Sequence, residues 1–275
     1  MNSVMRWLII LSLIFGIQQK VAAQDSISDH IQNDYRLNLA YMKSYGPAAL
    51  HVVKSPARFD TKDWIFTGSV VAGLTVLYFN DLEVYEKIQS ISSAQGQSFA
   101  WTEIFGNGLV TLPSLAAIFI YGSVKNHDHS RNVALTGLQA FVFGAEGAFL
   151  LKHLTHRVRP DMEMNPNQWF GPFHRFDADA FPSGHAMRAF VMATTLAGMY
   201  DDKPWLGAGF YALAGLTAYG RLVSGEHWPS DVLAGAALGY FIGRGLVHFN
   251  KFNAGRKAEI IPFSGSGGFG LVLRF

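Results

Sequence analysis

Three clusters of polar residues interrupt a chain that is otherwise strongly apolar. They are rich in arginine, lysine, histidine and aspartate. Arginine and lysine hold phosphate oxygens, and histidine serves as a nucleophile or a proton carrier near neutral pH. The chain of 275 residues has no cysteine, which excludes disulfides and thiolate metal sites. The clusters therefore indicate anion chemistry carried by basic side chains.

The first cluster is Lys152 with Arg159 and Pro160. Lys152 and Arg159 are spaced by about two helical turns, so both side chains can project from one face near the end of a helix. Pro160 helps to end that helix, because the residue before a proline is driven out of helical geometry. Two cations at a helix end suit an anion, although a basic patch at a membrane boundary has the same composition.

The second cluster, Pro182-Ser183-Gly184-His185, stands immediately before an apolar stretch. Ser183 supplies a hydroxyl donor, and Gly184 lets the backbone approach a ligand closely. The free N–H groups of the helix start attract an anion, and His185 is then placed to deliver a proton to it. An ordinary helix cap with a polar histidine would have the same sequence.

The third cluster, Arg221, His227 and Asp231, surrounds a helix start predicted at Pro229. His227 lies just outside that helix, and Asp231 lies in its first turn. We predict that the Asp231 carboxylate accepts a hydrogen bond from one imidazole nitrogen of His227, which leaves the other nitrogen free to attack. Arg221 is expected to reach in from the preceding helix and bind phosphate.

Together the clusters resemble the signature motifs of the type 2 phosphatidic acid phosphatase (PAP2) family. Its superfamily also contains the class A acid phosphatases and the vanadium haloperoxidases. The resemblance implies a phosphatase without metal or cofactor, in which His227 forms a phosphohistidine, Asp231 orients His227, and His185 protonates the leaving group. It also implies a set of residues that hold phosphate oxygens: Lys152, Arg159, Ser183, Gly184 and Arg221.

The implied substrate is a lipid phosphate or pyrophosphate in a membrane. Two residues depart from the family pattern. Gly220 stands where serine is common, which removes one possible hydroxyl contact but should leave catalysis intact. Trp228 stands where lipid phosphatases commonly have tyrosine, and it weakens the substrate assignment because acid phosphatases and haloperoxidases also have tryptophan there. Two alternatives stay open, a vanadate-dependent haloperoxidase with the same pocket and a non-catalytic membrane protein that binds phospholipid. The net charge of +2 gives no case for a nucleic-acid partner.

Other polar residues near the clusters carry weaker signals. Three residues inside the first cluster are interpreted as solvated at a membrane interface: His153, His156 and Arg157. Three residues before Pro182 lack the spacing of a metal site: His174, Asp177 and Asp179. Glu226 is unusual beside His227, where it either tunes the histidine or faces water.

Six apolar stretches of helix length must position the clusters: 64–79, 104–121, 133–154, 186–200, 205–223 and 232–249. Hydrophobic residues make up 49% of the chain and charged residues 15%, against about 25% charged in typical domains. Most stretches are rich in glycine and alanine, as packed membrane helices are. The expected fold is all-α, a bundle of about six mostly transmembrane helices with the active site at one end. A helical bundle without lipid contact is the alternative.

The two ends of the chain differ from this bundle. Arg6, a short apolar run and small residues indicate a signal peptide or N-terminal anchor over residues 1–23. Residues 24–62 are polar and are expected to form short helices or loop outside the core. The catalytic helical domain is expected over 63–250, followed by a tail, 251–275, with one short strand.

The predicted location is a bacterial cell envelope, in a membrane with the active site facing the periplasm. Basic residues favour this orientation because several fall on the side away from the clusters: Lys125, Arg131, Lys203, Lys251, Arg256 and Lys257. A cleaved signal peptide conflicts with it. Three crossings after an external N-terminus would leave Lys152 and Arg159 inside.

Overall fold

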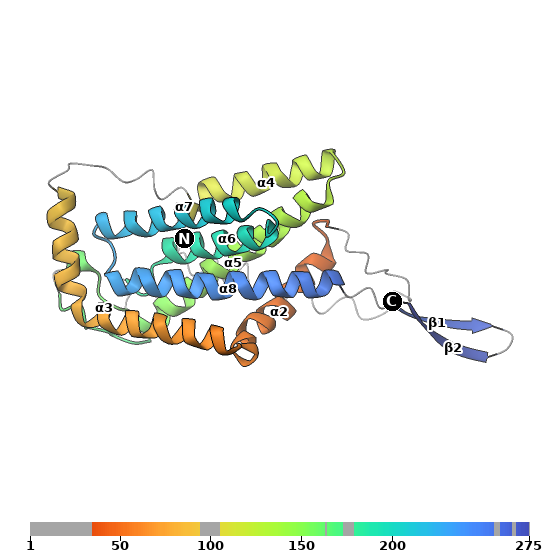
Figure 1. The fold of residues 1–275 in the computed structure, drawn as a ribbon, viewed down its shortest axis with the longest axis horizontal. Coiled ribbons are helices and arrows are strands. Elements are labelled where there is room, and N and C mark those ends of the chain that lie inside the picture. The colour runs from red at the N-terminus through yellow and green to blue at the C-terminus, as the bar shows by residue number, and fades with distance from the viewer. Residues whose placement is uncertain are drawn as a thin grey trace, which may run out of the picture. The chain divides into compact units, whose positions relative to one another are not determined.

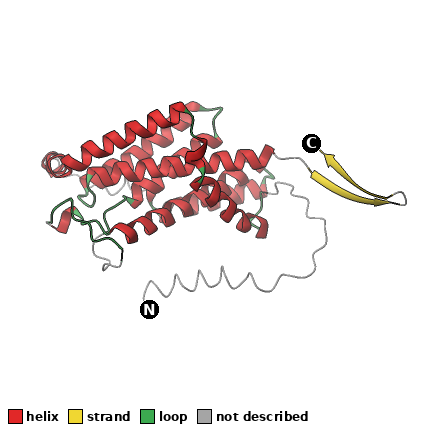
Figure 2. Ribbon diagram, turned by 90° about the horizontal axis from the view of Figure 1, so that it is seen from below, coloured by secondary structure: helices red, strands yellow, loops and turns green. Residues whose placement is uncertain are grey.

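The computed structural model describes residues 35–93, 105–162, 164–172, 179–255, 259–265 and 268–274. In these ranges the chain forms seven α-helices and two short 3-10 helices, followed by a two-stranded hairpin. Figure 2 shows the helices in red and the two strands in yellow. The predicted signal peptide or anchor over residues 1–23 lies outside the described residues and stays a prediction.

Each of the six apolar stretches falls on its own helix. In chain order these helices are α3 (Thr61–Ser93), α4 (Gly108–Val124), α5 (Asp128–Thr155), α6 (Gly184–Met199), α7 (Pro204–Val223) and α8 (Pro229–Gly255). The side chain of Asn107 caps α4 by accepting the N–H of Leu109 at 2.9 Å. Pro204 and Pro229 begin α7 and α8 as predicted, since the first residue of a helix needs no N–H partner.

Helix α6 is the centre of the bundle and packs against α5, α7 and α8. Figure 1 shows it between α7 and α8. Glycines on α8 allow the closest approach, because a methyl group added at Gly235 would lie 2.5 Å from the carbonyl oxygen of Ser183. Gly239 and Gly243 repeat this spacing along α8 and also face α6. Small residues at every fourth position let two helix backbones pack tightly in a membrane protein.

The start of α6 lies against the end of α5, since Gly184 faces Lys152, and against the start of α8, since the Ser183 N–H donates to the Asp231 carbonyl at 3.0 Å. The short connection 224–228 joins the end of α7 to α8. The first cluster is at the end of α5 and in the loop that follows it. The second cluster is at the start of α6, and the third lies between the end of α7 and the first turn of α8. The fold therefore brings all three clusters to one end of the bundle.

Residues 24–62 were expected to form short helices or loop outside the core; in the described part, from residue 35 on, helix α2 (Leu39–Val53) instead packs into the core. Ala48 is fully buried and belongs to the main hydrophobic cluster. The Tyr41 hydroxyl donates to the Leu135 carbonyl at 2.9 Å, and the Gln139 amide donates to the Ser44 hydroxyl at 3.2 Å. The polar side chains that suggested a solvent-exposed segment thus bind α5. A 3-10 helix, Ser55–Arg58, then leads into α3.

The tail also differs from the prediction of one strand. Strands β1 (Glu259–Gly265) and β2 (Gly268–Arg274) pair antiparallel, with Glu259 opposite Arg274 and Gly265 opposite Gly268. The second strand carries the alternating pattern visible in the sequence. The first strand was missed because Pro262 and the polar residues near it weaken the strand signal.

Apolar side chains cover much of the outer surface of the bundle. Three described helices are long and apolar enough to cross a membrane: 61–91, 128–155 and 229–251. In the apolar window of α3 only 6% of residues are buried. Its exposed residues include Trp64, Ile65, Phe66, Val71, Val76 and Phe79. Continuous exposed apolar surface of this kind is suited to lipid, and the helical domain is that of a membrane protein.

Candidate active site

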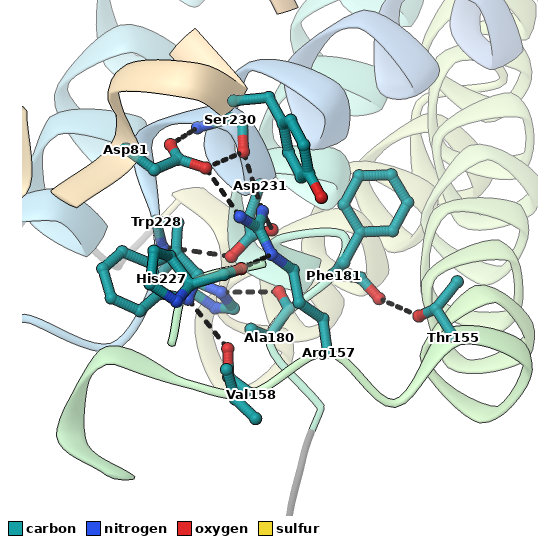
Figure 3. Close-up of polar contacts among 12 residues, drawn as sticks. Asp81, Thr155, Arg157, Val158, Ala180, Phe181, His227, Trp228, Ser230 and Asp231 are labelled. Atoms are coloured by element: carbon teal, nitrogen blue, oxygen red, sulfur yellow. Dashed lines mark hydrogen bonds and ion pairs between the residues drawn. The ribbon is translucent and has the colours of Figure 1, made fainter. Parts of the chain in front are cut away.

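His227 is almost fully buried in the loop between α7 and α8, at 2% exposure. Its Nδ1 atom lies 2.8 Å from the carbonyl oxygen of Ala180 (Figure 3). Because a carbonyl can only accept, the ring proton is on Nδ1, and Nε2 keeps its lone pair. Burial, together with the charges of Lys152 and Arg159, lowers the pKa of His227 well below 6.5. The imidazole is therefore neutral at neutral pH and has a nitrogen available for attack.

Asp231 does not bind the His227 ring, which corrects the predicted pairing. One oxygen of its carboxylate accepts the N–H of Trp228 at 3.0 Å, and the other accepts from Arg157 at 2.5 Å. Asp231 is the third residue of α8, a position from which a carboxylate reaches back to the N–H just before the helix. Asp231 thus fixes His227 through the main chain of its neighbour, while the Ala180 carbonyl sets the tautomer.

Lys152 and Arg159 share one carboxylate partner, Asp179, in the loop before α6. The Lys152 ammonium donates to the carbonyl of Asp179 and to its carboxylate, the latter at 3.3 Å. Arg159 Nε donates to the other carboxylate oxygen at 2.6 Å. Burial would raise the pKa of the Asp179 carboxyl, but the two cations lower it below its usual value. Asp179 therefore carries a negative charge at the site.

Glu226 is a second carboxylate shared between two cations, here Arg159 and Arg221. Its carboxylate pairs with Arg221 and lies 3.3 Å from Arg159 Nη1. Neither expectation for Glu226, that it tunes His227 or faces only water, describes this bridge. Two carboxylates thus join Lys152, Arg159 and Arg221. These three residues are called the phosphate-site cations below, after the role predicted for them.

The start of α6 supplies neutral donors. Ser183 is fully buried, and its hydroxyl has no hydrogen-bond partner among the described residues. It makes no side-chain cap to the helix, while its backbone N–H donates to the Asp231 carbonyl at 3.0 Å. A methyl group added at Gly184 would lie 3.7 Å from Cε of Lys152. A buried hydroxyl, the free N–H groups of a helix start and a lysine thus converge, which is an arrangement suited to an anion.

His185, the second residue of α6, faces the same positive charges. Burial, followed by the charges of Arg221 and Arg188, lowers its pKa to about 3. Lys152 and Arg159 contribute in the same direction. His185 is consequently neutral when the site holds no anion. Arg188, one turn further along α6, was not singled out in the sequence because it lies in an apolar helix outside the three clusters.

Arg157 is the main residue that sequence reasoning placed wrongly. Its side chain is fully buried, as is that of His156, so the interpretation of both as solvated interface residues is wrong. The Arg157 guanidinium pairs with Asp231 and with Asp81 of α3 (Figure 3). His153 is half-buried and its ring lies 2.6 Å from the Phe149 carbonyl.

The described residues contain no group of three histidine or acidic side chains placed to hold a metal ion. Of the three residues considered for such a site, His174 and Asp177 lie outside the described residues. The third, Asp179, pairs with Lys152 and Arg159.

These features define a membrane-embedded helical protein with a buried histidine and a group of basic side chains at one end of its packed helices. Residues 132–254, a little under half of the chain, match the family model described as the PAP2 superfamily. The matched segment contains every predicted site residue. It does not contain α3, and therefore it does not contain Asp81.

Named proteins resemble the chain over shorter or more distant matches. The lipid A 1-phosphatase of Porphyromonas gingivalis is 42% identical over 67 residues, which is 24% of this chain and only 15% of that protein. The undecaprenyl-diphosphatase of Sulfolobus acidocaldarius is 25% identical over 167 residues, covering 61% of this chain and 71% of that protein. The crystal structure of Aquifex aeolicus LpxE matches with a TM-score of 0.47 and 23% identity, covering 61% of this chain and 94% of the other.

Proposed function

We propose that the chain is a PAP2-type phosphatase that hydrolyses a lipid phosphate or lipid pyrophosphate through a covalent phosphohistidine on His227. One observation carries the proposal. A buried, neutral His227, with its proton held on Nδ1 by Ala180, is placed among the charges of the phosphate-site cations. The names of similar proteins, a lipid A 1-phosphatase and an undecaprenyl-diphosphatase, support the same class of substrate.

Substrate binding begins with an exchange of anions. The phosphate oxygens take the place of the Asp179 and Glu226 carboxylates on the phosphate-site cations. The Ser183 hydroxyl and the free N–H groups at the start of α6 donate further hydrogen bonds. These donors also stabilise the negative charge that builds up on the phosphoryl oxygens in the transition state.

The chemistry then proceeds in two steps. Nε2 of His227 attacks phosphorus, the P–N bond forms, and the P–O bond to the lipid breaks as the leaving oxygen takes a proton from His185. A water molecule next attacks phosphorus while His185 accepts its proton, and the P–N bond breaks to release phosphate. His185 has to be protonated for the first step. Burial and the nearby cations together lower the pKa of His185 to about 3, and bound phosphate raises this pKa because it neutralises the cations.

The three phosphate-site cations supply the positive charge that metal ions supply in many other phosphoryl-transfer enzymes. We therefore expect full activity in EDTA. Loss of all activity in EDTA with recovery on adding magnesium would contradict this part of the proposal. Vanadate is expected to inhibit, because it adopts the five-coordinate geometry of the transition state. Peroxidase activity with vanadate would instead support the haloperoxidase alternative.

Phosphate release from a panel of lipid phosphates and pyrophosphates tests the function directly. Wild-type protein should release phosphate and form an acid-labile phosphoprotein, and His227→Ala should do neither while still folding. His153→Ala is a matched control, since His153 lies on α5 and bonds to the carbonyl of Phe149 in its own helix. Near wild-type turnover by His227→Ala would remove the nucleophile assignment. No turnover on any lipid would favour the non-catalytic alternative.

The site end of the bundle is proposed to face the periplasm. The exposed basic residue Lys125 precedes α5, and Lys203 precedes α7, so both lie at the end away from the site. Such residues favour the cytoplasmic side. The chain has no native cysteine, so Asn167→Cys at the site end and Lys125→Cys at the other end are clean probes. In intact spheroplasts an impermeant thiol reagent should label only Asn167→Cys. The reverse pattern would place the site in the cytoplasm.

A further inference from the structure

Arg157 is a fully buried cation that is not one of the phosphate-site cations. Its Nη1 atom donates to Asp231 at 2.5 Å and to the Ser230 hydroxyl at 2.7 Å. Its Nη2 atom donates to Asp81 at 2.6 Å. Nε donates to the carbonyl of Pro166 at 3.0 Å. Both carboxylates that it binds are themselves fully buried, so its charge is neutralised within this network and is not available to a substrate.

Asp81 joins the start of α8 to α3. One carboxylate oxygen accepts the backbone N–H of Ser230 at 2.8 Å, and the other accepts the Ser230 hydroxyl at 2.5 Å. Ser230 is the second residue of α8, so its N–H has no partner within the helix. A carboxylate from α3 therefore caps α8 and lies at the positive end of the helix dipole. Figure 3 shows Asp81, Arg157 and Asp231 facing one another around Ser230.

The network ends at the loop that carries the nucleophile. The second oxygen of Asp231 holds the N–H of Trp228, the neighbour of His227, at 3.0 Å. The Trp228 indole N–H donates to the carbonyl of Val158 at 2.8 Å, and the Trp228 ring lies 6.0 Å from the Arg157 guanidinium carbon. Arg157 therefore supports both the carboxylate and the aromatic ring that fix the residue next to His227.

We propose that Arg157 and Asp81 are positioning residues for His227, acting through Asp231 and the first turn of α8. The inference rests on the proposed function and extends it to α3, a helix outside the PAP2 match. Removing Arg157 would leave Asp81 and Asp231 as two buried carboxylates without their shared cation. Asp231 would then lose its fixed orientation, and with it the position of the Trp228 N–H. The phosphate-site cations should keep their partners Asp179 and Glu226, because these two carboxylates do not belong to the network.

Arg157→Lys is the informative variant, because lysine keeps the charge but lacks the planar guanidinium that reaches all four acceptors. We expect kcat to fall about 100-fold, as for a nucleophile displaced by about 1 Å. KM and inhibition by vanadate should change less than about 3-fold, equivalent to about 0.65 kcal/mol. Asp81→Asn should also reduce kcat, but by a smaller factor. In the double variant of Arg157→Lys and Asp81→Asn, the fall in kcat should be smaller than the product of the two single falls.

Arg244→Lys is the matched control. Arg244 pairs with Asp63 and so joins the same two helices, α8 and α3, away from the site. This change should leave kcat unaltered even where it lowers the melting temperature. Equal losses of kcat in Arg157→Lys and Arg244→Lys at equal loss of melting temperature would reduce Arg157 to a structural role and overturn the proposal.

A second readout does not depend on turnover. In protein with 15N-labelled histidine, the Nδ1–H of His227 should give a hydrogen-bonded proton signal, assigned by its absence in His227→Asn. The signal should weaken or shift in Arg157→Lys and Asp81→Asn and persist in Arg244→Lys. An inactive wild type would remove the proposed function, whereas an unchanged His227 signal in both site variants would remove the positioning role. If Arg157→Lys does not fold, Asp81→Asn decides between these outcomes.

Discussion

Two ion-pair clusters connect α3 with α8, and they differ in burial and in what they touch. At the site end, Asp81 and Asp231 bind Arg157 with no side-chain exposure in either pair. At the other end, Asp63 pairs with Arg244 through two hydrogen bonds, with side chains 11% and 44% exposed. Both clusters pair arginine with aspartate and link the same two helices, although Arg157 itself comes from the loop after α5. The difference lies in the surroundings.

The comparison separates a contact that joins helices from one that also shapes a reaction site. Arg244 ends at a helix surface, and nothing at the catalytic end depends on its position. Arg157 is enclosed by carboxylates and aromatic rings, with Tyr78 and Trp169 at 5.3 and 5.0 Å from its guanidinium carbon. Its carboxylate partner holds the chain next to His227. Under the proposed positioning role, the buried network holds Asp231 in one orientation, and Asp231 in turn holds the residue next to His227.

The largest expected difference between the two clusters is in stability. Arg157→Ala leaves two buried carboxylates unpaired, which costs about 3–5 kcal/mol. Arg244→Ala removes a pair that solvent and lipid head groups can partly replace, so its cost should be much smaller. Thermal unfolding in detergent measures both. Equal shifts in melting temperature would mean that burial does not distinguish the two clusters.

The next effect is on catalysis. Asp231→Asn places an amide NH₂ against one of two donors, Arg157 or the Trp228 N–H, so one hydrogen bond becomes a repulsion. We expect kcat to fall about 100-fold through misplacement of His227. Asp63→Asn makes the same chemical change at the other cluster and should leave kcat unchanged. A loss in Asp63→Asn as large as in Asp231→Asn would show that any α3–α8 contact controls the rate.

Sequence reasoning located the three polar clusters but not the contacts that join them to α3. The helices and the three clusters were predictable because apolar stretches, prolines at helix starts and residue spacing are local signals. Asp231 was selected correctly as a residue near His227, but its partner was not. The acceptor for His227 is the carbonyl of Ala180, a backbone group that no side-chain pattern reveals.

Asp81 and Arg157 were missed for a related reason. Their pairing depends on how α3 packs across α8, and the two residues are separated by more than two helices in the chain. Charged residues beside apolar helices usually mark a membrane interface, which made solvent exposure the natural expectation for Arg157. Asp81 lies just beyond the apolar stretch 64–79, beside Asn80 and close to Glu83, so its sequence neighbours carried no signal of burial.

The pKa of His227 should also respond differently to changes at the site and at the Asp63–Arg244 pair. Burial and the phosphate-site cations hold its pKa well below 6.5, so the native imidazole stays neutral at pH values where a free imidazole takes up a proton. Its nucleophilic form should therefore persist as the pH falls through 6.5. Lys152→Met removes one of the cations and should raise this pKa, while Arg244→Lys should not. NMR titration of the histidines without phosphate measures the pKa of His227 in wild type, Lys152→Met and Arg244→Lys. An unchanged His227 pKa in Lys152→Met would show that the charge of Lys152 does not lower it.

The smallest expected effect concerns the carboxylates that occupy the phosphate-site cations. Glu226 bridges Arg159 and Arg221, and its side chain is 42% exposed. Substrate phosphate has to displace it, so Glu226→Gln should lower KM and strengthen inhibition by inorganic phosphate. Because solvent reaches the Glu226 carboxylate and screens its ion pairs, we expect them to contribute about 1 kcal/mol, which corresponds to a gain of about 5-fold. The value of kcat should stay close to wild type, because Glu226 leaves the arginines before chemistry begins.

Asp202→Asn is the control, since Asp202 is an exposed carboxylate between α6 and α7, and this change should alter neither kcat nor KM. A weaker affinity for phosphate in Glu226→Gln would mean that Glu226 helps to arrange the arginines for phosphate rather than competing with it.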